Sequence, residues 1–320
     1  MNFNWTKVAT WFSLVWVVNL LNIACNSRLN SNNHTLNNSS HRNHIQELLQ
    51  DQISLEKLSI AVIPHLSSSE QAEKIQLLDN YLEKSLGLPV EIQVTKNYQK
   101  SVDLLVEGKV EMAYLGAVTY IKARERNPNL EAILAPIDKT TGRPWYTSVI
   151  VANTTKSIKT SQDLVNKRFS FVNQSSTSGY LIPSMHFQEQ GINPEQDFAS
   201  IQYAGSHDKN LAALQSEVVD AIAIDKKTYL RQEKSGKIDS NKYQIIWESE
   251  PIPSTPLVIS NQLPSVLITA IKRSLIQAPE GLVSLDGSDS FGYTLVEDED
   301  YELIRQMLKS YSGKQPQLKQ

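Results

Sequence analysis

Strand-like and helix-like segments alternate along the chain from Leu58 onward. Short β-prone runs at residues 58–64, 90–94 and 110–115 are separated by stretches whose apolar residues recur at helical spacing, most clearly over residues 69–86. Strands that alternate with helices favour an α/β fold with a parallel-rich sheet and right-handed crossovers. The composition fits a globular protein of this class, with 40% hydrophobic and 20% charged residues in a chain of 320.

The same alternation starts again in the second half of the chain. It predicts further strands at residues 168–172, 198–203, 219–225 and 242–248. Three prolines at positions 251, 253 and 256 then break the pattern. We interpret this break as a place where the chain crosses from one lobe to another.

We therefore expect two α/β lobes with a ligand cleft between them. The first lobe would comprise residues 55–151 and 252–320, and the second residues 152–251, with one crossing at each junction. In open α/β sheets, ligands bind at the carboxyl ends of strands. His207 and Asp225 both fall at predicted strand ends, which makes them candidates for the site.

The most specific local feature is a cluster of small hydroxyl residues between a predicted strand and a predicted helix. Ser176, Thr177, Ser178 and Gly179 follow the strand at residues 168–172 and open the helix. The first N–H groups of a helix have no intrahelical acceptor, so with the hydroxyls and the positive end of the helix dipole they can bind a small oxyanion. An ordinary N-cap is the alternative, because Ser and Thr are favoured there without any ligand.

Ser178, His207 and Asp225 are also the residue types of a nucleophilic triad. The chain has no Gly-x-Ser-x-Gly turn that would present such a serine. We expect a binding protein and not an enzyme, and keep a Ser/His/Asp hydrolase as the weaker alternative.

Residues 1–25 have the layout of an export signal. Lys7 is the only charge before an apolar run at residues 8–21, and an Ile-Ala step leads to Cys25. Cys25 is the only cysteine of the chain, and it stands where bacterial lipoprotein signals place the cysteine that carries lipid. Asn22 departs from the leucine usual in such signals, so the alternative is a cysteine that happens to fall in a signal peptide or anchor.

Residues 26–54 are rich in Asn, Ser and His with few large apolar residues, which predicts a disordered tether. The uneven spacing of its histidines at positions 34, 41 and 44 favours polar filler over a metal site. The formal net charge of the chain is −3 and there is no basic block. A non-specific nucleic-acid footprint needs clustered Lys and Arg, so nucleic acid is not an expected partner.

Several segments, taken in their order and at their intervals, resemble the periplasmic substrate-binding proteins of phosphonate and phosphite ABC transporters. The resemblance extends over about residues 58–308, and its most specific segment is the Ser-Thr-Ser cluster. The matching segments are DNYLEKSLG (79–87), Tyr98, AYLG (113–116), WYTSVIV (145–151), STSGYLIP (176–183), GSH (205–207) and VDA (219–221). The resemblance implies a two-lobed periplasmic-binding-protein fold of type II.

The resemblance also implies how the site is built. Ser176, Thr177 and Ser178 would hold a phosphorus oxyanion through hydroxyls and backbone amides, while Tyr98 and Tyr146 reach it from the opposite lobe. His207 would hydrogen-bond the oxyanion. For Asp225 three roles stay open: accepting the proton of a singly protonated ligand, accepting the hydrogen bond of His207, or capping a turn at the strand end.

Two positions depart from the members that take aminoalkylphosphonates. Those members carry carboxylates that meet the ligand's amino group, and the corresponding positions here are Lys227 and Thr255. The resemblance therefore points to small ligands such as phosphite, methylphosphonate or phosphate, and away from 2-aminoethylphosphonate.

The implied function is high-affinity extracytoplasmic binding of such an anion for delivery to an ABC transporter permease. We expect a periplasmic monomer that holds neither cofactor nor metal and meets the membrane only through a lipid on Cys25. A tethered sensory module with the same ligand site is the alternative.

Replacement of the candidate lipid-bearing cysteine tests the anchoring. If Cys25 carries lipid, Cys25→Ser should move the protein from the membrane fraction to the soluble periplasmic fraction, because the anchor would be lost while the signal is still read. Cell fractionation followed by immunoblotting measures this. Unchanged membrane association of the mutant, with the signal still cleaved, would show that the lipoprotein interpretation is wrong.

Overall fold

A computed structural model of the chain describes residues 55–312. The predicted signal peptide with Cys25 (residues 1–25) and the predicted tether (26–54) lie outside the described residues. Among the residues it does describe, no helix combines the length and the apolar character needed to cross a membrane.

The first sheet has six strands in the order β13-β4-β12-β3-β1-β2. β1 pairs in parallel with β2 and β3, whereas β12 runs antiparallel to β3 and β4, and β13 antiparallel to β4. The strands are β1 (Leu58–Val62), β2 (Val90–Val94), β3 (Met112–Tyr114), β4 (Leu130–Asp138), β12 (Leu257–Ser260) and β13 (Ser290–Leu295). We call this sheet and its helices the first lobe.

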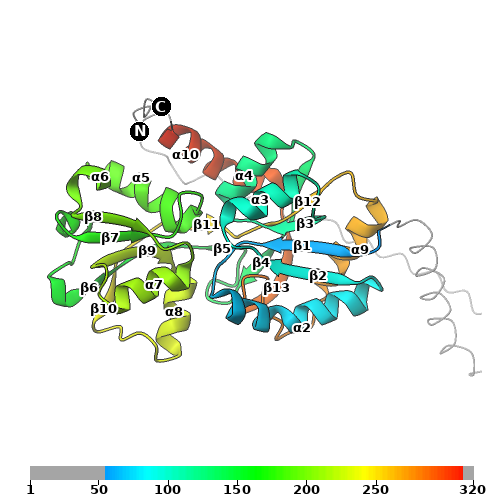
Figure 1. The fold of residues 1–320 in the computed structure, drawn as a ribbon, viewed down its shortest axis with the longest axis horizontal. Helices are drawn as coiled ribbons and strands as arrows, with labels where there is room; N and C mark the ends of the chain where they lie inside the picture. Colours follow the sequence, from blue (N-terminus) through cyan, green and yellow to red (C-terminus); the bar gives the residue numbers. More distant parts are fainter. Residues whose placement is uncertain (1–54, 313–320) are drawn as a thin grey trace, which may run out of the picture. The chain divides into compact units, whose positions relative to one another are not determined.

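Helices cover both faces of the first sheet (Figure 1). α2 (Ser68–Leu86) and α9 (Ser265–Ile276) bury their apolar stripes against one face, and α3 (Tyr98–Val106) and α4 (Ala117–Arg126) against the other. Alternate side chains of β1 enter the two core clusters in turn. A strand buried on both faces reads as a continuous apolar run, which is why this segment was recognisable in the sequence.

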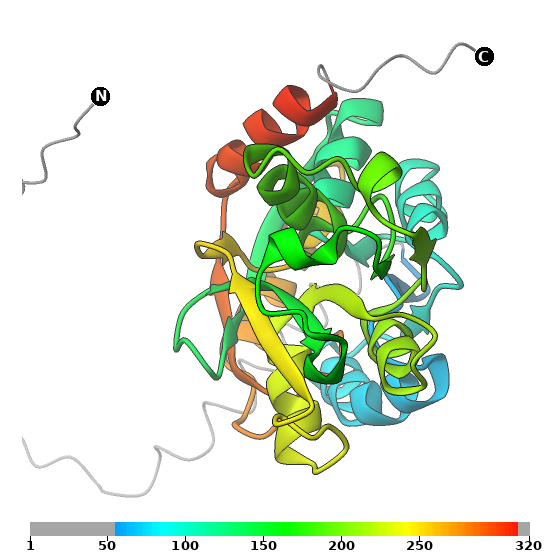
Figure 2. The same ribbon diagram turned by 90° about the vertical axis from the view of Figure 1, so that its left-hand side faces the viewer.

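The second sheet has five strands in the order β10-β6-β9-β7-β8. β7 is parallel to β8 and β9, whereas β6 is antiparallel to β9 and β10. The strands are β6 (Ser148–Asn153), β7 (Arg168–Phe171), β8 (Ser200–Tyr203), β9 (Ala221–Asp225) and β10 (Tyr243–Glu248). We call this sheet and its helices the second lobe, and it faces the viewer in Figure 2.

Each of the three parallel strands of the second lobe leads into a helix. The turn η3 (Thr177–Leu181) and helix α5 (Ile182–Glu189) follow β7, α7 (His207–Gln215) follows β8, and α8 (Lys226–Lys234) follows β9. Since parallel strands end at the same edge of a sheet, the starts of these helices gather at that edge. Smaller helices complete the lobe, namely η1 (Thr154–Lys156), η2 (Ser161–Leu164) and α6 (Pro194–Asp197).

Two short strands connect the lobes. β5 (Trp145–Tyr146) and β11 (Ile252–Pro253) pair antiparallel and form a separate two-stranded ribbon that lies between the two sheets in Figure 1. The first crossing comes earlier than we expected. The strand that includes residues 148–151, assigned above to the first lobe, pairs with β9 and β10 and so belongs to the second sheet.

Both sheets are mixed, because antiparallel strands join the expected parallel ones. The antiparallel members include β6 and β12, the strands that the chain enters after crossing from the other lobe. A parallel strand needs a crossover, usually a helix, to bring the chain back to its starting edge. A strand entered from the other lobe needs none, and the alternation of strands and helices does not reveal its direction.

The last described helix touches both lobes. After the short helix η4 (Asp298–Tyr301), α10 (Glu302–Ser312) packs on α4 of the first lobe and on η3 of the second, and both views show it beside α4 (Figures 1 and 2). The hydroxyl groups of Tyr311 on α10 and Tyr180 in η3 lie 3.3 Å apart. Helix α10 therefore meets the Ser-Thr-Ser turn from outside.

The Ser-Thr-Ser turn is a π-helical turn that packs closely against the end of β7. The N–H of Val172 donates to the carbonyl of Gly179 over 3.0 Å. A Cβ atom on Gly179 would lie 2.5 Å from Cγ2 of Val172 and 2.9 Å from Oγ of Ser176, closer than real Cβ atoms approach. Glycine at this position is therefore what permits the strand and the helix start to meet so tightly.

Gly179→Ala should destabilise the fold by about 1–3 kcal/mol, the usual cost of overpacking a well-packed site. The added methyl group must displace either Val172 or the cap at Ser176. Urea unfolding of the purified protein measures the effect. Gly116→Ala is the matched control, because a Cβ there would meet its neighbours at 3.6 Å or more, and equal loss of stability in the two variants would contradict the close packing.

Candidate functional site

One cavity brings together every residue that the sequence assigned to the ligand site. Residues of both lobes line it, and its volume is about 20 Å³, little more than the roughly 10–15 Å³ needed for one water molecule. The predicted residues that line it are Tyr98, Tyr146, Ser176, Thr177, Ser178, His207 and Asp225. The other lining residues are Ile63, His65, Gly116, Lys227 and Thr255.

The three hydroxyl residues of the turn are buried at the cavity wall. The hydroxyl of Ser176 accepts from the Gly179 N–H over 3.0 Å, so Ser176 is the N-cap of the turn. The hydroxyl of Thr177 accepts from the N–H of Val118 in the first lobe over 3.1 Å. A hydroxyl that accepts from a backbone N–H still has its own proton to donate. The cap and the anion site are therefore compatible roles for these hydroxyls.

Tyr98 and Tyr146 meet this turn from outside the second sheet. Tyr98 is the first residue of α3, and Tyr146 lies in β5. Tyr98 and Tyr146 line the same cavity as Ser176 and Ser178, and the nearby serine side chains act against the effect of burial on the two phenols. Burial raises the pKa of Tyr98 and raises that of Tyr146 to about 12. Both phenols are therefore protonated at neutral pH and can donate to an anion.

Asp225 is the N-cap of α8 and a buried carboxylate at the same time. Its Oδ1 accepts from the Thr228 N–H over 2.8 Å, and its Oδ2 accepts from the Thr228 hydroxyl over 2.9 Å. Its Oδ2 also lies 2.7 Å from Nδ1 of His207. Burial would raise the pKa of this carboxyl, but His207 above all, with His65 and Lys227, outweighs burial and holds the pKa well below its usual range.

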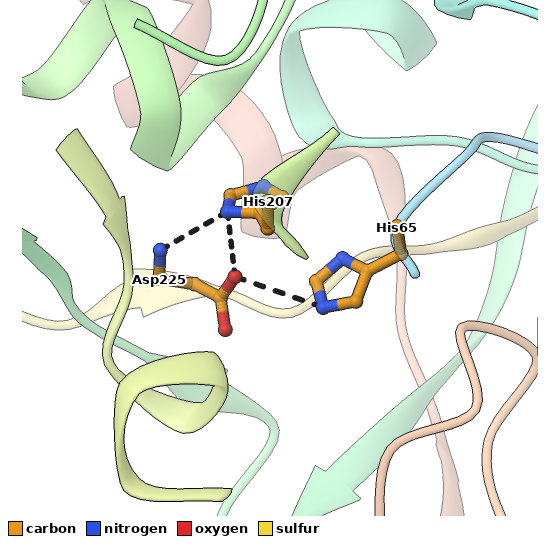
Figure 3. Close-up of side chains that lie close together, drawn as sticks. All are labelled: His65, His207 and Asp225. Atoms are coloured by element: carbon orange, nitrogen blue, oxygen red, sulfur yellow. Dashed lines mark hydrogen bonds and ion pairs between the residues drawn. The ribbon is translucent and has the colours of Figure 1, made fainter. Parts of the chain in front are cut away.

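The proton between His207 and Asp225 belongs to the histidine. An ionised carboxylate can only accept, so the 2.7 Å contact needs a proton on Nδ1. The backbone N–H of Asp225 also points at Nδ1 from 3.2 Å, which would need the other tautomer. We assign the proton to Nδ1, because the bond to the charged oxygen is the shorter and stronger one. Nε2, on the far side of the ring from Asp225 in Figure 3, is then left for other partners.

His65 also lines the cavity, although it was not among the residues predicted for the ligand site. Its Nε2 lies 3.1 Å from the Thr228 hydroxyl and 3.7 Å from Oδ2 of Asp225, and its ring centre is 4.7 Å from that of His207 (Figure 3). Burial lowers its pKa to about 3, so it is neutral at neutral pH. His65 follows the carboxyl end of β1, and the strand-end rule that found His207 and Asp225 would have found it too.

His65, His207 and Asp225 could in principle hold a metal ion, since each offers a ligand atom within 4.8 Å of the others. Ligands at the usual distance of about 2.0–2.1 Å from a tetrahedral zinc ion stand more than about 3 Å apart. Nδ1 of His207 and Oδ2 of Asp225 are closer than that, at 2.7 Å, and Thr228 also bonds this oxygen. The geometry is that of a hydrogen-bond network, and we assign no metal to it.

A buried ion pair closes the cavity wall next to Tyr146. Nζ of Lys227 on α8 bonds a carboxylate oxygen of Asp286 and lies 5.6 Å from the centre of the Tyr146 ring. Burial would lower the pKa of Lys227, but Asp286 and Asp225 raise it above its usual value. The loop between α9 and β13 contributes Asp286, and nothing in its sequence marked it as part of the site.

The arrangement does not form a catalytic triad. His207 does meet Asp225, but the part of the chain that the structure describes shows no hydrogen bond between Ser178 and His207. The Ser178 carbonyl instead accepts from the Ser148 hydroxyl over 2.6 Å. The site instead places hydroxyl and phenol donors on one side and a network of carboxylate, ammonium and imidazole groups on the other. The hydroxyl and phenol donors of such a site can hydrogen-bond a small anion.

Known proteins resemble the chain in both sequence and structure. A family model for the periplasmic phosphonate substrate-binding proteins of ABC transporters matches residues 60–301. The phosphate-import protein PhnD of Mycolicibacterium smegmatis is 26% identical over 270 residues, which cover 78% of this chain and 84% of that protein. The phosphonates-binding periplasmic protein of Escherichia coli is 28% identical over 182 residues, 55% of this chain and 53% of that protein.

Two solved structures share the fold. PhnD1 from Prochlorococcus marinus in complex with methylphosphonate superposes with a TM-score of 0.72 at 19% identity, covering 80% of this chain and 98% of that one. A binding protein of an ABC phosphonate transporter from Pseudomonas aeruginosa gives 0.73 at 22% identity, covering 80% and 86%. The fold is therefore the two-lobed type II periplasmic-binding-protein fold. The chain belongs to the family of periplasmic substrate-binding proteins of phosphonate ABC transporters and is a binding protein, not an enzyme.

Proposed function

We propose that this protein binds a small phosphorus oxyanion, namely phosphite, methylphosphonate or phosphate, and delivers it to the permease of an ABC transporter. The observation that carries the proposal is the convergence of donors from both lobes on one small cavity. Ser176, Thr177 and Ser178 line it from the second lobe, and Tyr98 and Tyr146 face them. In this proposal the protein acts as a monomer, anchored through Cys25 and the tether of residues 26–54.

Closure of the lobes would surround the anion with donors. In the structure, Tyr98 and Tyr146 line the small cavity together with Ser176 and Ser178. An anion between them would receive charge-assisted hydrogen bonds, which are roughly twice as strong as neutral ones. Such donors favour ligand binding, because a buried anion without them would be costly.

His207 and Asp225 would select the protonation state of the ligand. With the proton of Nδ1 directed at Asp225, Nε2 of His207 is the ring nitrogen left for the ligand. A hydrogen bond between Nε2 and an anion oxygen needs one proton, which either the ligand or the imidazole ring must carry. The charge of Asp225 nearby favours a ligand that brings its own proton. Phosphorus oxyanions can be singly protonated near neutral pH, whereas sulfate is not.

Single substitutions in the turn test the anion socket. Ser176→Ala and Thr177→Ala should each weaken methylphosphonate binding by roughly 1.5–3 kcal/mol, the scale of a hydrogen bond to a charged group. The fold should survive, because a lost cap costs only about 1 kcal/mol. Calorimetric titration of the purified protein gives the affinities. Ser175→Ala is the control, because Ser175 bonds Lys122 and does not line the cavity; a similar loss there, or loss of folding alone, would contradict the socket.

A panel of anions tests the ligand class. Phosphite or methylphosphonate should bind at least about 100-fold better than 2-aminoethylphosphonate, equivalent to roughly 2.7 kcal/mol, because the ammonium would meet Lys227 and Thr255. Sulfate should bind weakly, since it brings no proton to the His207–Asp225 side. Calorimetry of the wild-type protein against all these anions measures both ratios. Equal affinity for phosphite and 2-aminoethylphosphonate would show that Lys227 and Thr255 do not form the wall next to the ligand's substituent. Tight sulfate binding would show that Asp225 does not contact the ligand.

A further inference from the structure

We propose that the ion pair between Lys227 and Asp286 is a latch between the lobes that restricts the ligand to phosphorus oxyanions with no substituent larger than a methyl group. The proposal rests on the function proposed above. It assigns ligand-size selection to two residues, of which Asp286 does not itself line the cavity.

The two partners come from different lobes. Lys227 stands in the first turn of α8, two residues after the cap Asp225, and Asp286 lies in the loop between α9 and β13. Both are withdrawn from water: the Lys227 side chain is 15% exposed and that of Asp286 is 2% exposed. An ion pair at this position forms only when the lobes are together.

The Asp286 side of the latch is built in advance by the first lobe. Its Oδ1 accepts from the N–H of Ser288 over 2.9 Å and from the hydroxyls of Ser284 and Ser288. Its Oδ2 accepts from the Tyr114 hydroxyl over 3.4 Å and from Lys227. The carboxylate therefore keeps donors of its own lobe when Lys227 leaves, and presents one oxygen to the incoming ammonium.

A second contact holds the same helix start to the first lobe. The Thr228 hydroxyl donates to Asp225, so it accepts from Nε2–H of His65, which belongs to the first lobe. The start of α8 is thus fixed at two consecutive residues, Lys227 and Thr228. In the closed form, Lys227 cannot move away from the cavity without breaking a buried ion pair.

The position of Lys227 relative to the anion socket explains the size limit. Its ammonium is 5.6 Å from the centre of the Tyr146 ring. Tyr146 lines the cavity together with Ser178 of the socket, and Thr255 completes this side. A substituent that extends from the socket towards this wall must push Lys227 off Asp286 and leave a buried carboxylate without its cation. This limit applies to neutral and to charged substituents, unlike the repulsion of an ammonium.

A series of alkylphosphonates separates the latch from simple charge repulsion. For the wild-type protein, calorimetric affinities should fall at least about 10-fold from methylphosphonate to ethylphosphonate and further to propylphosphonate, because each added carbon presses on Lys227. Lys227→Ala should reduce the methyl-to-ethyl affinity ratio to below about 3-fold. Lys226→Ala is the matched control, since the neighbouring Lys226 pairs on the surface with Glu248, and it should keep the wild-type ratios.

Asp286→Asn keeps the shape of the carboxylate and removes its charge, so it should shift the chain-length ratios in the same direction as Lys227→Ala. If thermal unfolding shows that Lys227→Ala does not fold, Asp286→Asn tests the latch in its place. Unchanged ratios in both variants would overturn the latch, as would a loss of phosphite affinity greater than about 100-fold in Lys227→Ala, which would make Lys227 a direct anion ligand. Absence of wild-type binding to phosphite, to phosphate and to every phosphonate of the series would overturn the proposed function itself.

Discussion

The carboxylate of Asp225 is only 1% exposed, and a charge so far from water has to be hydrogen-bonded on both oxygens. Thr228 supplies an N–H and a hydroxyl from α8, and His207 supplies Nδ1–H from α7. His65, at the end of β1 in the other lobe, donates to the same Thr228. One buried charge therefore determines how two helices of the second lobe are held and where the first lobe meets them.

The anion donors stand apart from this network, and the separation has a chemical consequence. Ser176, Thr177 and Ser178 with the two tyrosines present neutral donors, so they suit any small oxyanion. Selection has to come from the charged groups on the remaining wall. His207 with Asp225 responds to whether the ligand carries a proton, and Lys227 with Asp286 responds to what the ligand carries in place of an oxygen.

Several contacts that join the lobes around the cavity are polar. Val118 donates to Thr177, His65 to Thr228, and Lys227 pairs with Asp286. Water can replace each of these partners when the lobes separate, so their net contribution to closure is modest. A bound anion adds contacts that exist only in the closed form, and this differential contact is what a ligand needs to shift such an equilibrium.

The sequence by itself predicted the secondary structure of most of the fold and placed the Ser-Thr-Ser cluster, His207 and Asp225 at strand ends, whereas Tyr98 and Tyr146 came only from the family resemblance. Apolar periodicity shows which face of a segment is buried, and the starts of helices after parallel strands mark one sheet edge, so Ser176, His207 and Asp225 could be found. Neither signal shows at which residue the chain passes from one lobe to the other, which is why residues 148–151 of β6 were assigned to the first lobe. Only the tertiary structure brought Lys227 to Asp286, 59 residues further along the chain, and His65 to Thr228, 163 residues away. An ion pair or a hydrogen bond between the lobes depends on how the two lobes meet. The local periodicity of the sequence contains no information about which distant residues that meeting brings together.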